Sequence, residues 1–223
     1  TTLGYGNQSG IVENSELERL TARINLNHRL LDDKLKLSLQ GSLSRVNDDL
    51  APVAGSAGFQ GDVLGAAFSA NPTWPNDPDF DAGTLINPAN LLAYSQGKTN
   101  TNRYLLNLSA EYNLTTDLKA KLAVGFDNSN SENFSVTSAD ALGVTGGVPG
   151  NGRGGYNELD VKNQLFEATL TYNKSFENSK LEALGGFSYQ SFNNKGVNAS
   201  GWGFSSNNLD QMGSDLQNIV TGV

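Results

Sequence analysis

The chain has 223 residues, a formal net charge of −8, no cysteine and a single histidine, His28. These counts exclude a disulfide framework, a thiolate metal site and any relay that needs a second histidine. They also argue against a nucleic-acid-binding protein, which would carry a basic footprint. No apolar run approaches the roughly 18 residues of a transmembrane helix. A transmembrane β-strand is still allowed, because it needs only about 9–11 residues with every second one apolar.

Residues 1–16 are polar and predict a loop or the frayed entry to the strand that follows. A hairpin is predicted over about 17–46, because apolar and polar residues alternate on both sides of the polar turn Leu31–Lys34. This period of two places the apolar side chains on one face of each strand, whereas a helix would need a period near 3.6. The apolar positions are Leu20, Ala22, Ile24, Leu26, Leu35, Leu37, Leu39 and Leu43.

A long polar loop is predicted over 47–103, with two short helices inside it. The first helix covers about 59–70 and ends before Pro72, because the residue that precedes a proline disfavours helical backbone. The second covers about 86–94, with Pro88 in its first turn, where a missing backbone N–H costs little.

An acidic stretch inside this loop, Asp77–Asp81, carries three carboxylates at a spacing of two. Calcium binds clustered carboxylate oxygens, which makes the stretch a weak candidate for a metal site. Ala82 and Pro88, however, stand where an EF-hand loop requires glycine and glutamate. A solvated acidic loop is therefore the simpler interpretation. The weak metal candidates are Asp77, Asp79 and Asp81.

The second predicted hairpin, over about 104–137, has the clearest alternation in the chain. From Tyr104 to Leu114 every even position is apolar, and Leu105 is the one apolar residue at an odd position. The polar turn Thr115–Asp117 follows, after which the alternation resumes. Two alternating runs joined by a tight turn predict an antiparallel pair of strands.

A glycine-rich loop is predicted over 138–158, a third hairpin over about 159–192, and a polar loop over 193–223 with a short helix near 209–216. Residues 150–155 match G-x-G-x-x-G by letter, but the strand and crossover helix of a nucleotide-binding fold are missing around them. A flexible loop is the better interpretation of this motif.

Short turns at one end of the hairpins and long polar loops at the other predict an all-β fold. We expect an antiparallel up-and-down sheet of about six strands, part of a transmembrane β-barrel with short periplasmic turns and long extracellular loops. Six strands are too few to close a bacterial barrel, whose known minimum is about eight. We therefore expect an open sheet with two unpaired edges, in an internal segment of a longer protein.

Three stretches, 71–75 (NPTWP), 87–127 and 165–203, resemble the SusC/RagA class of TonB-linked (TonB-dependent) outer-membrane transporters. The resemblance covers most of the chain and implies a barrel of about 22 strands, plugged by an N-terminal domain that has no counterpart here. It also implies an importer in the outer membrane of a Gram-negative bacterium, which takes up oligosaccharides, oligopeptides or other large nutrients. A SusD-like surface lipoprotein would be its partner, and the TonB complex would act through the missing plug. The resemblance implies neither a cofactor nor an enzymatic activity.

Four residues are candidates for contact with a ligand. Glu111 and Glu167 lie on the polar face of predicted strands, which in a barrel lines the lumen. A carboxylate pair can also hydrolyse a glycosidic bond, but nothing in the sequence sets these two at a catalytic separation. Trp74 and Trp202 fall in long loops, where an exposed aromatic ring can stack on a sugar. Anchoring of the loops explains the two tryptophans equally well.

A soluble all-β carbohydrate-binding module is the alternative to a barrel. It would bury the apolar faces of two sheets against each other. Such a module would be monomeric in detergent-free buffer, whereas an open segment of a barrel would not.

Overall fold

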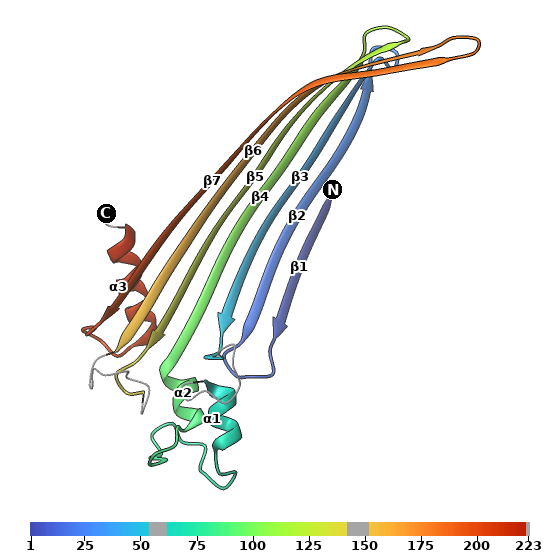
Figure 1. Ribbon diagram of the computed structural model, residues 1–223. Helices are drawn as coiled ribbons and strands as arrows, with labels where there is room; N and C mark the ends of the chain where they lie inside the picture. Colours follow the sequence, from blue (N-terminus) through green and yellow to red (C-terminus); the bar gives the residue numbers. More distant parts are fainter. Residues whose placement is uncertain (54–61, 142–151, 222–223) are drawn as a thin grey trace.

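Seven antiparallel strands form one sheet, in which each strand is hydrogen-bonded to its neighbours in the sequence (Figure 1). The computed structural model describes residues 1–53, 62–141 and 152–221. The strands are β1 (Thr2–Ser9), β2 (Glu16–Leu30), β3 (Leu35–Leu50), β4 (Ser95–Asn113), β5 (Leu118–Thr137), β6 (Arg153–Ser175) and β7 (Lys180–Trp202). The helices are α1 (Val63–Ser69), α2 (Pro88–Tyr94) and α3 (Leu209–Thr221).

The strand pairing confirms the predicted up-and-down order. In the first hairpin Leu30 pairs with Leu35 and Ala22 with Leu43, so the two alternating runs face each other as expected. The second and third hairpins pair in the same way, and the pairs β3–β4 and β5–β6 join the hairpins into one sheet. Side chains of one kind on one strand therefore stand beside side chains of the same kind on the next.

The first strand, β1, is an addition to the six that the sequence predicts. Leu3 pairs with Ala22 and Tyr5 with Leu20, so β1 continues the apolar face of β2. Glycines occupy positions 4 and 6, where the alternation would place polar side chains. The pattern of a strand is therefore incomplete, and the sequence indicates a loop or a frayed strand entry. The free edge of the sheet is consequently β1 rather than β2, and the other edge is β7, as predicted.

The strands extend beyond the predicted hairpin bounds at the long-loop end. The hairpins cover 16–50, 95–137 and 153–202 instead of about 17–46, 104–137 and 159–192, so the long loops are shorter than predicted. Most residues of these extensions are polar on both faces, apart from single apolar residues such as Tyr156, so the alternation that reveals a strand is lost there. The backbone ladder is supported instead by polar contacts across the strands, such as Asn133 Nδ2 to Thr99 Oγ1 at 2.7 Å.

The short helices form where proline and side-chain caps predict them. The Asp62 carboxylate accepts the amide of Leu64 and begins α1, which lies inside the predicted 59–70; residues 59–61 are outside the described part. Asn87 caps α2 in the same way, with Pro88 at the first helical position as expected. Helix α3 starts at the predicted residue, Leu209, and runs to Thr221 instead of 216. Within the described residues, no helix is long and apolar enough to cross a bilayer.

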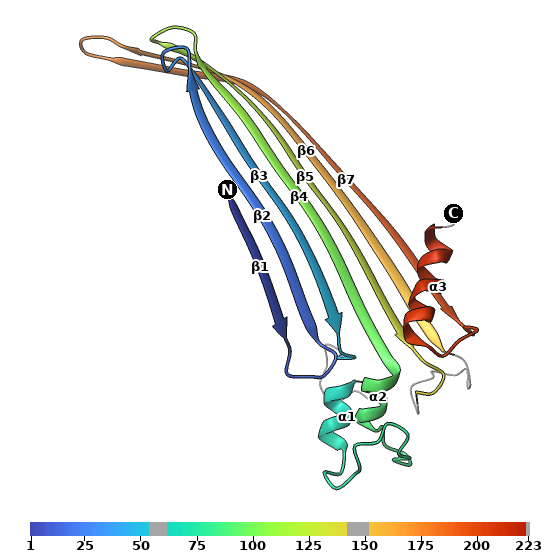
Figure 2. The ribbon, with the colours of Figure 1, turned by 180° about the vertical axis from the view of Figure 1, so that it is seen from behind.

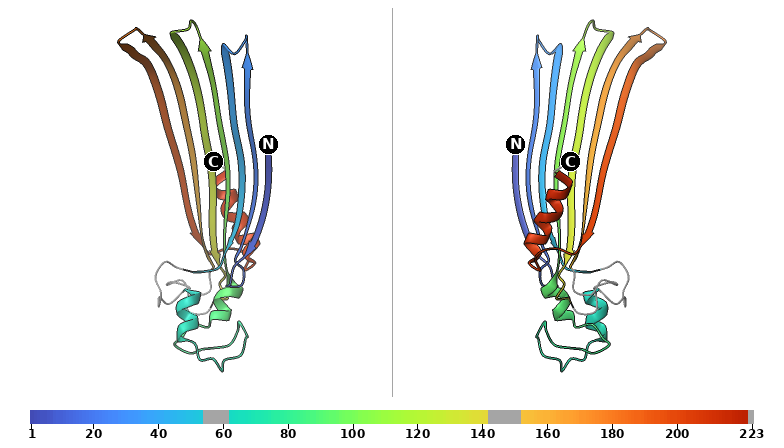
Figure 3. Two further views of the ribbon diagram at one scale, coloured as in Figure 1. Left: turned by 90° about the vertical axis from the view of Figure 1, so that its right-hand side faces the viewer. Right: turned by 90° about the vertical axis from the view of Figure 1, so that its left-hand side faces the viewer.

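The three short turns lie at one end of the sheet, and the helices lie at the other (Figures 1 and 2). The sheet is curved but not closed, with β1 and β7 at opposite edges (Figure 3). Its buried apolar residues gather in two small clusters at the helical end. One consists of Val63, Ala66 and Leu91, and the other of Val136, Tyr156, Met212 and Leu216. The faces of the long strands, by contrast, are open.

Candidate functional site: the two faces and the loop end of the sheet

One face of the sheet is apolar over its short-turn half; we call it the apolar face. The register aligns a complete row of apolar residues across β2 to β7. This row is Leu26, Leu39, Leu108, Val124, Phe166 and Tyr189. Many of these side chains are solvent-exposed, including Leu108 at 44% and Tyr189 at 56%. A continuous apolar surface of this extent marks a contact with lipid or protein.

The opposite face, which we call the polar face, carries charges in cross-strand ladders. Glu111 of β4 pairs with Lys36 of β3 and Lys121 of β5, and it also lies 3.8 Å from the Lys119 ammonium. Glu167 lies on the same face of β6, where it pairs with Ala123. Strand β5 stands between the two glutamates, so the structure does not bring these two candidate residues together.

A second ion pair on the polar face was not singled out from the sequence. Arg103 of β4 donates from Nε and Nη2 to the two carboxylate oxygens of Asp127 on β5, at 2.9 and 2.8 Å. This two-pronged geometry is the strongest arrangement of an arginine and a carboxylate. The sequence carries part of this signal, since Asp127 is an odd position of the predicted hairpin and Arg103 is the odd position immediately before it.

The acidic loop between α1 and α2 is held by its own side chains. Asp77 accepts the amide of Asp79, and Asp81 accepts the amide of Gly83. The Tyr94 hydroxyl donates to the Asp79 carboxylate at 2.7 Å, which raises the pKa of this tyrosine. The described residues contain no group of three or more acidic, histidine or cysteine side chains that could hold a metal ion.

The two candidate tryptophans lie apart. Trp74 is half-buried in the α1–α2 loop, where its ring packs at 5.6 Å from the ring of Phe80. Trp202 ends β7 and is 68% exposed. The first therefore anchors its own loop, and the second presents a free aromatic surface at the helical end of the sheet.

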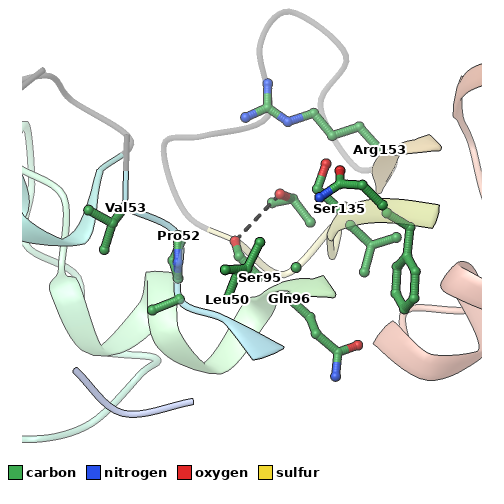
Figure 4. Close-up of a pocket in the computed structure, with 13 residues that line it drawn as sticks. Leu50, Pro52, Val53, Ser95, Gln96, Ser135 and Arg153 are labelled. Carbon is green, nitrogen blue, oxygen red and sulfur yellow. Dashed lines mark hydrogen bonds between the residues drawn. The ribbon is translucent and has the colours of Figure 1, made fainter. Parts of the chain in front are cut away.

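A cavity of about 370 Å³ opens at the helical end, where β3 ends and β4 begins (Figure 4). Ser95 and Gln96 line one side of it, and Arg153 lies on the other. The Ser95 hydroxyl donates to Thr137 Oγ1 at 3.4 Å. Among the described residues, the side-chain oxygen of Gln96 is the one buried side-chain polar atom without a hydrogen-bond partner.

Helix α3 covers the sheet on the side of the apolar face, beyond the apolar rows. Met212 and Leu216 are buried there against Val136 and Tyr156. A β-carbon at Gly154 would overlap the Leu216 side chain, so the glycine allows the helix to approach the strand. The sequence predicts both the helix and the end of β5, but it does not predict the contact between them.

No family model matches the chain. Over 214 residues it is 30% identical to TonB-dependent receptor P3 of Formosa agariphila, covering 92% of this chain and 21% of the relative. It is 23% identical over 172 residues to TonB-dependent receptor SusC of Bacteroides thetaiotaomicron, covering 64% of this chain and 16% of the relative. The solved structure of the RagAB peptide transporter matches 92% of this chain and 24% of its own, with a TM-score of 0.72 at 19% identity.

The chain is a SusC-like part of a TonB-dependent receptor. The RagAB likeness shows that its seven strands have the fold of a transporter barrel wall, here left unclosed. The chain spans about a fifth of the length of the TonB-dependent receptor P3 that it matches. The relatives are named receptors and a transporter, in line with the prediction of a transport protein.

Proposed function

We propose that the chain is a wall segment of an energy-coupled importer in the outer membrane of a Gram-negative bacterium. The observation that carries the proposal is the continuous apolar face, exposed across β2 to β7, on a sheet with a barrel-wall fold. In this arrangement the apolar face contacts lipid, and the polar face lines the passage. A sandwich would need a second sheet over the apolar face, and the described residues form one sheet.

The cargo is a large nutrient, an oligosaccharide or an oligopeptide, and a SusD-like lipoprotein delivers it at the loop end. Support comes from the relatives, one of which is SusC and another a peptide transporter. The TonB complex acts through a plug outside this chain. Glu111 and Glu167 on the polar face and Trp202 at the loop end are suited to contact cargo. Trp74 anchors its loop instead. Asp77 and Asp81 cap local turns, and Asp79 accepts the Tyr94 hydroxyl.

Orientation in the membrane gives a direct test with the full-length protein. The chain has no cysteine, so single cysteines can be introduced into a cysteine-free form of the whole protein. Thr73→Cys, in the long loop, should react with a membrane-impermeant thiol reagent on intact cells. Thr116→Cys, in a short turn, is the matched control and should react only after the outer membrane is permeabilised. Equal labelling of both cysteines on intact cells would overturn the proposed arrangement.

Energy coupling and partner are tested separately. Deletion of the gene should abolish growth on one large nutrient, and removal of TonB should reproduce that loss. A lipoprotein encoded beside the gene should co-purify with the receptor in detergent. A full-length protein that supports growth equally well without TonB would contradict the importer assignment, although the barrel fold would stand.

A further inference from the structure

Three arginines surround one hollow on the polar face, formed by β2, β3 and β4. Arg19 and Arg23 come from β2, and Arg103 comes from β4. The hollow has a volume of about 520 Å³, and Ser42 and Ser44 of β3 form its floor. The chain contains six arginines, and half of them line this one place, although the net charge of the chain is −8.

The strand register explains how the three side chains gather. Ser44 pairs with Arg103 on one side and with Thr21 on the other, while Ser42 pairs with Arg23. Adjacent strands lie about 4.8 Å apart, so Arg103 stands roughly 10 Å from β2, across the row of serines. Arg19 and Arg23 lie four residues apart on β2, about 13 Å along the strand, so their two long side chains can reach a group of a few ångströms placed between them. The serine hydroxyls beneath can donate to the same group.

The hollow has unbalanced positive charge. The Asp127 carboxylate neutralises Arg103 from the neighbouring strand. Arg19 and Arg23 are exposed and form no ion pair within the part of the chain that the structure describes. No carboxylate is among the described residues that line the hollow. A planar guanidinium fork matches a carboxylate or another oxyanion in two-pronged fashion, so the free pair is suited to a negatively charged group.

Along the strands, the hollow lies at the level where the apolar side chains on the opposite face of the sheet end. Leu43 and Tyr104 form the last apolar pair on β3 and β4, and the next residues outward on that face are Arg45 and Asn102. Ser42 and Ser44 flank Leu43 on the opposite side of the sheet. In an outer-membrane barrel this position is the loop-side mouth of the passage, which a solute meets before it reaches the membrane interior.

We propose that this hollow is a subsite for an oxyanion group, such as a carboxylate or a sulfate, carried by the imported cargo. The inference rests on the importer function proposed above, and it narrows the cargo to an anionic oligomer. The free pair Arg19 and Arg23 binds the oxyanion, and the Arg103–Asp127 pair forms the far wall. A carboxylate of the plug is the competing occupant, and the experiment separates the two.

The test measures charge at the hollow in the full-length, cysteine-free protein. Ser44→Cys places one thiol on the floor, and Ser38→Cys places a matched thiol on the same face of β3 nearer the short turn. Intact cells are treated with an anionic sulfonatoethyl or a cationic trimethylammonioethyl methanethiosulfonate. We expect the anionic reagent to react with Ser44→Cys about tenfold faster than the cationic one. That preference should vanish when Arg19→Gln and Arg23→Gln are added, and it should survive Arg29→Gln, which changes an arginine of the same strand outside the hollow.

Competition identifies the occupant. Tetragalacturonate should slow the labelling of Ser44→Cys, and the neutral maltotetraose should not. Equal rates for the two reagents, or equal protection by both oligomers, would overturn the oxyanion subsite. If neither reagent reached Ser44→Cys while both reached it in a plug-deleted receptor, the plug would be the occupant and the proposal would be wrong. The Thr73→Cys and Thr116→Cys labelling is independent of these outcomes, so failure of the subsite leaves the importer function standing.

Discussion

An arginine on the apolar face should cost far more than one on the polar face, and Leu108 offers the sharpest comparison. It lies at the centre of the apolar run of β4, four residues from Tyr104 and four from Tyr112. With a strand rise of about 3.4 Å and a tilt of about 40°, each end of the run is roughly 10 Å away along the membrane normal. Leu39 and Val124 flank Leu108 in the same row, so a charge there has no polar neighbour across either strand.

Arginine near the midplane of a barrel costs about 2–4 kcal/mol. At 1.4 kcal/mol for each factor of ten, Leu108→Arg should lower the folding equilibrium constant in bilayers by about 30- to 700-fold. Asn107→Arg is the matched control, since Asn107 is the next residue, is exposed, and pairs with Gln40 and Gly125 on the polar face. An exposed substitution of this kind should stay within about 0.5 kcal/mol.

The measurement is the urea dependence of folding of the full-length protein into phosphatidylcholine vesicles. Folded and unfolded forms can be separated by their different mobility on unheated gels. Equal destabilisation by Leu108→Arg and Asn107→Arg would refute the assignment of the apolar face to lipid. So would a cost confined to Asn107→Arg, because that result would place lipid on the opposite face.

Three further predictions follow from exposure and contacts. The isolated 23.7 kDa chain should aggregate without detergent, because it has two bare strand edges and an uncovered apolar face; a monodisperse monomer by light scattering would contradict this. Met212→Ala should release α3 from the sheet at a local cost of about 2–5 kcal/mol, seen as faster amide exchange in the helix, with the exposed Gln211→Ala as control; unchanged exchange would argue against the docked helix. Tyr94 should keep its hydrogen bond to Asp79 below the ordinary tyrosine pKa and lose it only as the pH rises through its raised pKa. Alkaline difference spectra against Tyr94→Phe measure this pKa, and an identical pKa in Asp79→Asn would exclude the carboxylate as the cause.

The sequence predicts most of the sheet because a period of two survives wherever one face is apolar and the other polar. The pairs Leu30–Leu35 and Tyr112–Ala120 follow directly from it. The period fails in two places for physical reasons. In β1, glycines stand at alternate positions, and at the loop end of β4 both faces are polar, so the ladder continues without any apolar signal.

Contacts between elements that are distant in the sequence were less predictable. The alternation assigns Arg19, Arg23 and Arg103 to one face, but their meeting depends on the offset between β3 and β4, which a loop of 51–94 hides. The docking of α3 likewise depends on Gly154, because a side chain there would overlap Leu216. The sequence does not predict this contact. Candidate ligand residues chosen by type alone, such as Trp74, were therefore the least secure part of the prediction.

The segment 51–94, which carries α1 and α2 between β3 and β4, also affects the order in which the sheet folds; we call it the α1–α2 insertion. Every strand pair joins sequence neighbours, but β3 and β4 must close over residues 51–94, whereas β2 and β3 close over 31–34. For an elevenfold longer loop, closure costs about 2 kcal/mol more in chain entropy. The insertion counters this cost by folding on itself, since Leu91 packs with Val63 and Ala66, and α2 runs directly into β4. Its assembly should therefore precede the β3–β4 pairing and set the pace at which the wall is completed.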